Sequence, residues 1–313
     1  MFTFAKFLKI FCMDNDIIRI NSPKAWLLAA RPKTLSAAAV PVLIATALAW
    51  KKDGGESFHC IAAVLCFLFA FIMQIDANFI NDYFDFKRGN DDETRLGPKR
   101  ACAEGWVSDR AMLWAICITT VLACFVGLPL VLYGGMDMMM VGVLCVVSCF
   151  LYTTTLSYMA LGDVLVLVFF GIVPVCCTYY VELSRAFNPL FDQTVWMSVA
   201  CGLVIDTLLI INNYRDYDND RRANKKTLAV MIGRKAMSAV YLLIVPVALA
   251  INLCCTFTIP MIVSCVIIFA LHFMSWRKMM KIGEGKELNS VLGLTARNIL
   301  LYGILTSITV ILS

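Results

Sequence analysis

Charged residues are scarce in this chain of 313 residues, in which Asp, Glu, Lys and Arg account for 16% and hydrophobic residues for 60%. A soluble domain carries roughly a quarter charged residues, and one core of this length cannot bury so much apolar surface. The mean hydropathy of +0.79 points the same way. The scarcity of charge excludes a soluble enzyme, a nucleic-acid-binding protein and a disordered regulator. It predicts an integral membrane protein.

Histidine is nearly absent, and the cysteines lack the spacing of a metal site. The two histidines, His59 and His272, lie far apart and offer no catalytic constellation. The 14 cysteines are spread through apolar stretches, and none stands in a CxxC or Cys/His cluster. We expect them to be small, buried apolar residues and not zinc ligands or disulfides.

The dominant feature of the sequence is a series of long segments without Asp, Glu, Lys or Arg. Runs of about 17 or more such residues are candidate membrane helices. Only helices and closed barrels span a bilayer, and long continuous apolar runs select helices. The sequence predicts nine spans, at 34–50, 57–75 (continuing towards 81), 111–132, 138–156, 164–180, 193–213, 236–255, 258–276 and 291–313. We therefore expect an all-α integral membrane protein, a bundle of nine transmembrane helices.

Basic residues mark one side of the predicted membrane. Lys and Arg gather on the side of the N-terminus, in 82–110, 214–235 and 277–290. The loops on the opposite side carry only Lys51, Lys52 and Arg185. Because cytoplasmic loops are enriched in Lys and Arg, we expect a cytoplasmic N-terminus.

The first residues are Phe-rich and precede the membrane domain. We expect residues 1–21 to form an N-terminal cytoplasmic segment and residues 22–313 to form the transmembrane domain. The apolar run is too short for a signal peptide and lacks a small-residue cleavage site. An interfacial helix and a natural start at Met13 both stay open. Ser22 and Pro23 predict a helix start, with an N-cap followed by proline.

Two acidic clusters lie at the cytoplasmic ends of predicted spans. Asn81 precedes Asp85 by four residues. Asn212 precedes Asp216 by four, and Asp220 follows after four more. Residues four apart share one face of a helix, so two such helices facing each other would bring several carboxylate and amide oxygens together. Mg²⁺ suits this concentration of negative charge because it prefers oxygen ligands and bridges carboxylates to substrate phosphates.

Basic residues flank both acidic clusters. They are Lys87, Arg88, Arg95, Lys99 and Arg100 beside the first and Arg221, Arg222, Lys225 and Lys226 beside the second, with Arg31 and Lys33 at the start of the first span. Acidic and basic groups at a lipid–water boundary suit a ligand with a charged phosphate head and a long apolar tail. The alternative is that these loops are simply solvated and the basic residues only set orientation.

The acidic clusters resemble a known pair of motifs. Asn81-x₃-Asp85 with Asp91, together with the second cluster, is similar to the paired aspartate motifs of the UbiA superfamily of intramembrane aromatic prenyltransferases. The stretches 30–35, 81–85, 95–100, 169–171 and 226–230 support the resemblance, which extends from Trp26 to the last span. Gly89 stands where the 4-hydroxybenzoate branch has an aspartate. Since Asp91 lies where the naphthoate branch places its last acid, the resemblance favours the naphthoate branch.

The resemblance implies a fold, a reaction and a cofactor. The helices would surround a central cavity, in a multi-pass protein of the bacterial inner membrane. The enzyme would transfer a polyprenyl group from polyprenyl diphosphate to 1,4-dihydroxy-2-naphthoate, with Mg²⁺ as cofactor and loss of carbon dioxide, giving demethylmenaquinol. The resemblance implies contact with membrane lipid. We infer neither a nucleic-acid partner nor an obligate protein partner.

The resemblance also implies roles for individual residues. The implied catalytic residues are Asn81, Asp85, Asp216 and Asp220; the metal ligands are Asp85, Asp91, Asp216 and Asp220; the substrate-binding residues are Lys33, Arg95, Lys99, Tyr152, Asn212 and Lys226. The basic groups suit phosphate oxygens, and the ring of Tyr152 suits an allylic cation. Loop 86–109 is polar and basic, and we expect it to order over the diphosphate as a lid.

Two other functions stay open. One is a sister prenyltransferase with a different acceptor, such as 4-hydroxybenzoate or homogentisate. The other is a secondary transporter, although transport sites lie near the bilayer midplane and these clusters lie at helix ends. Asp76 and Asp206 lie inside predicted spans, where charge is costly. Each is expected either to be a neutral acid bonded to a neighbouring helix or to point into the cavity as a partner for the acceptor ring.

Overall fold

The computed structural model describes residues 18–56, 58–89, 95–154, 159–184 and 192–313. Nine helical spans within these ranges are long and apolar enough to cross a membrane, which confirms the predicted all-α membrane fold. The helices are α2 (Pro23–Ala30), α3 (Leu35–Asp53), α4 (Cys60–Lys87), α5 (Asp109–Gly127), α6 (Leu130–Gly134), α7 (Met136–Thr154), α8 (Gly162–Val166), α9 (Val173–Glu182), α10 (Gln193–Arg215), α11 (Tyr217–Arg222), α12 (Leu228–Ile232), α13 (Arg234–Cys255), α14 (Ile259–Ile282) and α15 (Asn289–Ile311). Two 3₁₀ turns, η1 (Pro32–Thr34) and η5 (Lys286–Leu288), and a π-helical segment, η3 (Leu167–Ile172), complete the described helices.

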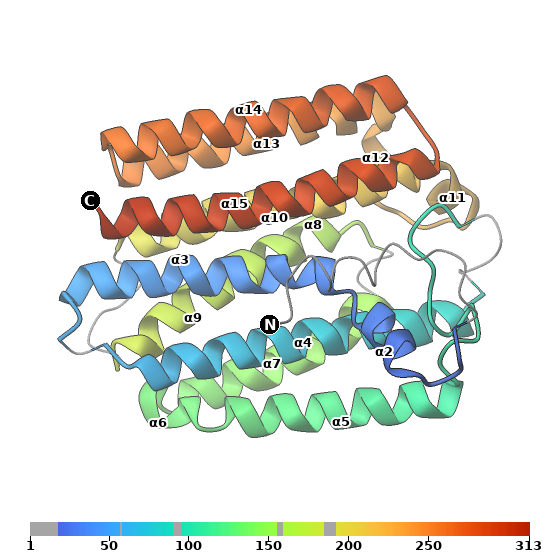
Figure 1. Ribbon diagram of the computed structural model, residues 1–313, viewed down its shortest axis with the longest axis horizontal. Coiled ribbons are helices and arrows are strands. Elements are labelled where there is room, and N and C mark those ends of the chain that lie inside the picture. The colour runs from blue at the N-terminus through green and yellow to red at the C-terminus, as the bar shows by residue number, and fades with distance from the viewer. Residues whose placement is uncertain (1–17, 57, 90–94, 155–158, 185–191) are drawn as a thin grey trace, which may run out of the picture.

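The long helices run side by side along the long axis of the molecule (Figure 1). Helices α13 and α14 form one side of the bundle and α5 and α6 the opposite side, with α3, α9, α10 and α15 between them. The short helices α2, α11 and α12 lie towards one end of the bundle, and the C-terminus lies at the other. The largest buried core joins residues of α3, α9, α10, α13 and α15.

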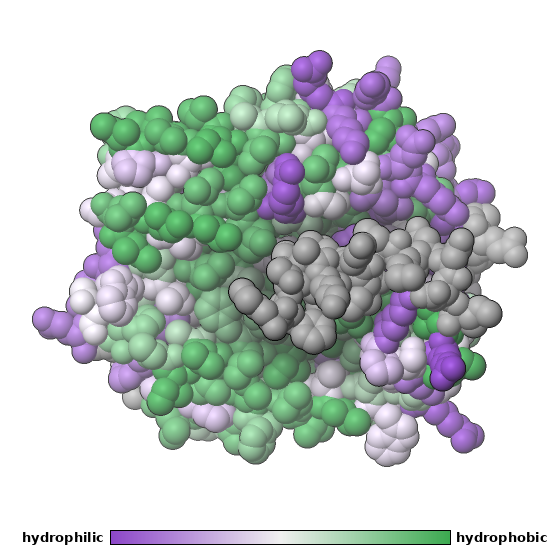
Figure 2. All heavy atoms as spheres, in the orientation of Figure 1, coloured by the Kyte–Doolittle hydropathy of each residue, from purple (hydrophilic) through white to green (hydrophobic). Residues whose placement is uncertain are grey.

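The sides of the bundle are apolar. Figure 2 shows hydrophobic side chains over these sides and hydrophilic ones gathered at the end that carries α11 and α12. On α5, Trp114, Val121 and Phe125 are 69%, 68% and 75% exposed. Large exposed apolar side chains in this number are unfavourable in water and favourable against lipid tails. The molecule is therefore a multi-pass membrane protein whose polar residues are concentrated at one end.

Local sequence explains how the first span is built. Ser22 accepts a hydrogen bond from the backbone N–H of Ala25 at 3.3 Å, and Pro23 opens α2, which confirms the predicted helix start. Arg31 then adopts a left-handed conformation, with φ 49°. The next residue, Pro32, has no backbone N–H and so cannot donate the hydrogen bond that would continue the helix. The first span therefore consists of α2, η1 and α3 in place of one uninterrupted helix.

A close helix crossing places η3 against α10. A Cβ on Gly171 would lie 2.7 Å from the Cα of Gly202, so only glycine permits this approach. The π-helical turn of η3 occupies the middle of the span predicted as a single helix at 164–180. Such segments widen a helix locally and are frequent near functional sites. Here the turn carries Phe169 and Phe170, whose side chains face a large internal cavity.

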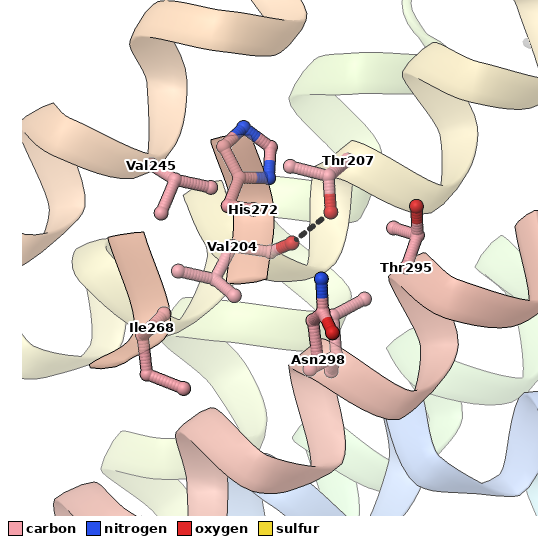
Figure 3. A pocket seen from close by; sticks show the side chains of 8 residues that line it. Val204, Thr207, Val245, Ile268, His272, Thr295 and Asn298 are labelled. Atoms are coloured by element: carbon pink, nitrogen blue, oxygen red, sulfur yellow. Dashed lines mark hydrogen bonds between the residues drawn. The ribbon is translucent and has the colours of Figure 1, made fainter. Parts of the chain in front are cut away.

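A second, much smaller cavity lies between α10, α13, α14 and α15 (Figure 3). His272 Nε2 lies 2.7 Å from the carbonyl oxygen of Tyr241, whose hydroxyl lies 2.7 Å from that of Thr295. Asn298 donates to Ser275 at 3.0 Å. With a volume of about 10 Å³ the cavity has room for about one water molecule. His272 is thus a buried packing residue.

Candidate active site

A cavity of about 570 Å³ lies within the bundle, between α3, α4, α7, α9 and α10. Apolar residues form most of its wall. Its polar lining residues are Thr34, Gln74, Asn81, Ser148, Tyr152, Thr178 and Asn212. Asn81, Tyr152 and Asn212 belong to the end nearest α11, which we call the mouth. The central cavity expected from the family resemblance is therefore present, and three of the predicted site residues line it.

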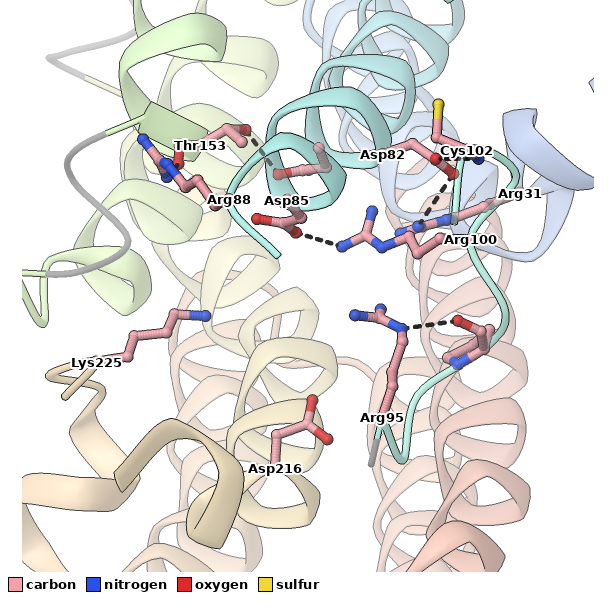
Figure 4. A network of polar contacts seen from close by, with 12 residues as sticks. Arg31, Asp82, Asp85, Arg88, Arg95, Arg100, Cys102, Thr153, Asp216 and Lys225 are labelled. Carbon is pink, nitrogen blue, oxygen red and sulfur yellow. Dashed lines mark hydrogen bonds and ion pairs between the residues drawn. The ribbon is translucent and has the colours of Figure 1, made fainter. Parts of the chain in front are cut away.

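The first aspartate motif occupies the last turns of α4 (Figure 4). Asn81 accepts a hydrogen bond from the Thr153 hydroxyl of α7 at 2.6 Å. Asp85 accepts from Arg100 at 2.6 Å. Asp82, which is 1% exposed, accepts from the backbone N–H groups of the two residues after Arg100, both at 2.9 Å. The end of α4 therefore holds residues 95–102, which we call the strap.

The second motif lies where α10 passes into α11. Asp216 donates its backbone N–H to the carbonyl of Asn212 at 2.9 Å, and Asp220 donates to Asp216 at 2.8 Å. The helical spacing of four predicted for these residues is thus kept across the junction. Arg215 forks onto the Asp216 carboxylate, with Nε and Nη2 at 2.8 and 2.6 Å.

Asp220 is buried, and one of its carboxylate oxygens, Oδ2, has no hydrogen-bond partner. Burial raises the pKa of the Asp220 carboxyl to about 6, with Lys225 opposing the shift and Asp216 adding to it. Lys225 Nζ lies 3.8 Å from the other oxygen. An unpartnered buried carboxylate oxygen at a cluster of acidic side chains is a donor suited to a hard cation.

The donor set fits Mg²⁺ shared with a substrate. No three His, Cys, Asp or Glu residues in the described ranges converge closely enough to hold a metal ion by themselves. Asp91, the predicted fourth acidic ligand, lies outside the described residues. Mg²⁺ is commonly bound by one or two carboxylates together with substrate phosphate oxygens. Asp85, Asp216 and Asp220 supply carboxylates of that kind on both sides of the mouth.

Charged side chains from four segments point into the same space at the mouth. In Figure 4, Asp85 and Asp216 face each other across a gap, with Lys225 on one side and Arg95 on the other. Arg95 Nε donates to the carbonyl of Pro98 at 3.0 Å, which bends the guanidinium back over the strap. Positive and negative groups that face one gap can bind a polyanion and its counter-cation together.

The basic residues predicted to bind phosphate differ in their exposure and in their partners. Lys99 turns outward, where it is 68% exposed and donates to Glu104 at 2.8 Å. Lys33 and Lys226 are also exposed. The Lys226 backbone forms an isolated bridge with Met159. Of the four basic residues predicted to bind phosphate, Figure 4 labels Arg95, which points into the gap.

Several residues at the mouth had no role assigned from the sequence. They are Arg31, Asp82, Arg100, Thr153, Arg215, Lys225 and Asn289. Arg31 Nη2 lies 4.0 Å from Asp82, so α2 also reaches the first motif. The sequence placed Arg100 and Lys225 beside the motifs without separating them from Lys99 and Lys226. The two pairs are distinguished only in the structure, by the direction in which the backbone turns each side chain.

Asp76 and Asp206, the carboxylates inside predicted spans, do not line the cavity. Asp76 is buried and accepts from Thr119 and Thr120 of α5, at 2.5 and 2.7 Å. The hypothesis that it points into the cavity is therefore wrong, and the alternative of a carboxyl bonded to a neighbouring helix is confirmed. Asp206 is 6% exposed and absent from the cavity wall, although Ile205 on the same helix lines it. An α-helix turns about 100° per residue, which separates these two side chains.

The fold and the site together define a class of protein. It is a multi-pass membrane protein with an apolar internal cavity whose mouth combines two aspartate motifs with guanidinium and ammonium groups. That arrangement suits an amphiphile with an anionic head, bound from the membrane.

Comparison with known proteins identifies the family. The model of the UbiA prenyltransferase family matches residues 38–299. The 1,4-dihydroxy-2-naphthoate octaprenyltransferase of Escherichia coli is 35% identical over 224 residues, 69% of this chain and 70% of that protein. The protein of the same name from Haemophilus influenzae is 35% identical over 221 residues, 67% of this chain and 70% of its own. The chain belongs to the UbiA prenyltransferase family.

The overall fold is also found in a solved structure. A UbiA homolog from Archaeoglobus fulgidus bound to DMAPP and Mg²⁺ is similar with a TM-score of 0.60. The similarity covers 90% of this chain and 98% of that chain at 15% sequence identity, and it concerns the fold alone.

Proposed function

We propose that this protein transfers a polyprenyl group from polyprenyl diphosphate to 1,4-dihydroxy-2-naphthoate, with loss of carbon dioxide, to give demethylmenaquinol. The observation that carries this proposal is the 570 Å³ apolar cavity, whose wall at one end includes Asn81 and Asn212 of the two aspartate motifs. It offers one compartment for a long apolar chain and a charged end for its diphosphate. The names of relatives at 35% identity supply the acceptor.

The residues at the mouth would bind the diphosphate. Asp85, Asp216 and Asp220, with Asp91, would hold Mg²⁺, which neutralises the charge that develops on the departing diphosphate. Arg95 and Lys225 point into the same gap and would donate to phosphate oxygens. Lys33, Lys99 and Lys226 remain proposed phosphate partners, although their side chains are directed to solvent or to other groups.

The cavity wall would protect the reaction from water. The allylic C–O bond of the prenyl diphosphate breaks, a ring carbon of the naphthoate forms the new C–C bond, and the carboxylate on that carbon leaves as carbon dioxide. Water would quench the allylic cation, and the apolar lining excludes it. The ring of Tyr152 lies in the wall at the mouth, where a cation–π contact contributes about 0.5–2 kcal/mol. Asn81 and Asn212 line the same end and would orient the diphosphate or the acceptor.

A panel of acceptors tests the proposed function. The purified protein would be supplied with octaprenyl diphosphate, Mg²⁺ and either 1,4-dihydroxy-2-naphthoate, 4-hydroxybenzoate or homogentisate. We expect prenylation of the naphthoate alone, with one carbon dioxide released for each product formed. Prenylation of another acceptor, with none of the naphthoate, would move the protein to a sister reaction. Failure to prenylate any acceptor would contradict the transferase assignment.

The orientation in the membrane is part of the proposal. The polar end that holds α11 and α12 would face the cytoplasm of a bacterial cell, with the membrane domain at 22–313 in the inner membrane. Labelling of single cysteines in intact cells tests this. A cysteine at the exposed Ser290 should react only after the cells are permeabilised, and labelling of intact cells would reverse the orientation.

A further inference from the structure

Asn289, the first residue of α15, uses both ends of its side-chain amide at the mouth of the cavity. Its Oδ1 accepts from Arg215 Nη1 at 2.8 Å, and its Nδ2 donates to the carbonyl oxygen of Leu96 at 2.8 Å. These partners are 74 and 193 residues away in the sequence. Because arginine only donates and a carbonyl only accepts, the amide has one orientation that satisfies both. One side chain therefore joins the last helix to the second motif and to the strap.

Arg215 needs this partner because its guanidinium is buried. Its side chain is 4% exposed, and a buried charge is stable only when it is paired and hydrogen-bonded. Two of its nitrogens donate to the Asp216 carboxylate, and a third donates to Asn289. The three contacts hold the guanidinium in one plane. The two hydrogen bonds from Arg215 in turn fix the orientation of the Asp216 carboxylate.

The strap packs directly on the same guanidinium. A Cβ on Gly97 would lie 2.9 Å from Arg215 Nη2 and 3.2 Å from Arg95 Nη2. A side chain at position 97 would therefore displace the Arg215 guanidinium from its present place. The other end of the strap is held by Asp82, so its two ends are bonded to opposite sides of the mouth.

We propose that Asn289 is a positioning residue for prenyl transfer: it keeps Arg215 on the Asp216 carboxylate and holds the strap, with Arg95, across the mouth. This inference rests on the proposed function, since it names a residue that prepares the same site. Asn289 touches neither reacting atom. It acts through Arg215 and through the backbone of Leu96.

The two hydrogen bonds can be removed separately. Asn289→Ala removes both. Asn289→Asp keeps an oxygen for Arg215 and loses the N–H that Leu96 requires. Gly97→Ala leaves Asn289 in place and crowds Arg215 from the side of the strap. Ser290→Ala is the matched control, because Ser290 is exposed and its hydroxyl donates only to the carbonyl of Glu287 within the same turn.

Two readouts test the inference. The first is kcat, with KM for prenyl diphosphate and for the acceptor measured separately. The second is trypsin cleavage within the strap, after Arg95, Lys99 or Arg100, without substrates. We expect Asn289→Ala and Gly97→Ala to lower kcat by about tenfold to a hundredfold, as for the loss of a hydrogen bond to a charged group. Ser290→Ala should match the wild type in both readouts.

Asn289→Asp separates the two connections. It should release the strap to trypsin as fast as Asn289→Ala while retaining more of kcat, because Arg215 keeps its acceptor. A merely structural role would lower the melting temperature and leave kcat of the folded protein unchanged. That result, or cleavage of the strap at the wild-type rate in Asn289→Ala, would overturn the inference. The cleavage readout needs no substrate, so it stays decisive even if the proposed reaction proves wrong.

Discussion

The carboxylate of Asp82 gives a direct test of how the strap is held at the first motif. It accepts the backbone N–H groups of Ala101 and Cys102, both at 2.9 Å, and Arg31 lies 4.0 Å away. In Asp82→Asn the amide retains one oxygen. Its NH₂ group would then face a backbone N–H, two donors that cannot bond to each other.

The cost follows from these contacts. A hydrogen bond to a charged group contributes about 1.5–3 kcal/mol, and a buried N–H without an acceptor costs about 1–3 kcal/mol. Asp82→Asn loses one charge-assisted bond, weakens the other and leaves one N–H unpaired, which amounts to about 3–5 kcal/mol. Because a local segment opens more easily than the bundle unfolds, we expect the strap to detach from α4 while the helices stay packed.

Steady-state kinetics with varied prenyl diphosphate measures the effect. We expect kcat/KM to fall by about a hundredfold or more, since each 1.4 kcal/mol is a factor of ten. Trypsin should cleave the strap faster. Asp109→Asn is the control, because Asp109 pairs with Lys87 where both side chains are more than 40% exposed, and such pairs contribute about 0–1 kcal/mol. Wild-type kcat/KM and an unchanged trypsin pattern in Asp82→Asn would refute the reasoning.

Three further outcomes are expected. Asp85→Asn and Asp216→Asn should each lower turnover by at least about a hundredfold, because an amide supplies no charge to a cation. Both variants should still insert into the membrane and elute as folded protein. Substantial Mg²⁺-dependent activity in both variants would contradict the metal assignment. Removal of divalent cations with EDTA should abolish turnover, and added Mg²⁺ should restore it; activity that persists in excess EDTA would exclude a required divalent cation. Gly171→Ala should destabilise the protein by about 1–3 kcal/mol in thermal unfolding, since its Cβ would meet Gly202 at 2.7 Å. Gly293→Ala, where a Cβ meets nothing within 4 Å, is its control, and equal melting temperatures for the two variants would argue against the close crossing.

Most of the fold could be predicted from the sequence because a membrane helix satisfies its backbone hydrogen bonds within itself. Length and apolarity of each run are therefore sufficient to locate it, and all nine predicted spans correspond to helical spans of the structure. The spacing of Asn212, Asp216 and Asp220 was sufficient for the same reason, since a helical repeat is local. The π-helical turn η3 was not predicted. It lies where Gly171 packs against Gly202 of another helix, and a contact between distant segments is not visible in either segment alone.

The site was predictable only in its local part. The sequence by itself determined where the acidic motifs lie and that basic residues accompany them. Tertiary structure alone decided that Arg100 and not Lys99 pairs with Asp85, and that Asp76 bonds to α5 instead of facing the cavity. It also decided that Asn289 reaches Leu96 across 193 residues. The physical reason is that a side chain's partner depends on how neighbouring helices are rotated against each other, and that rotation is set by packing between segments distant in sequence.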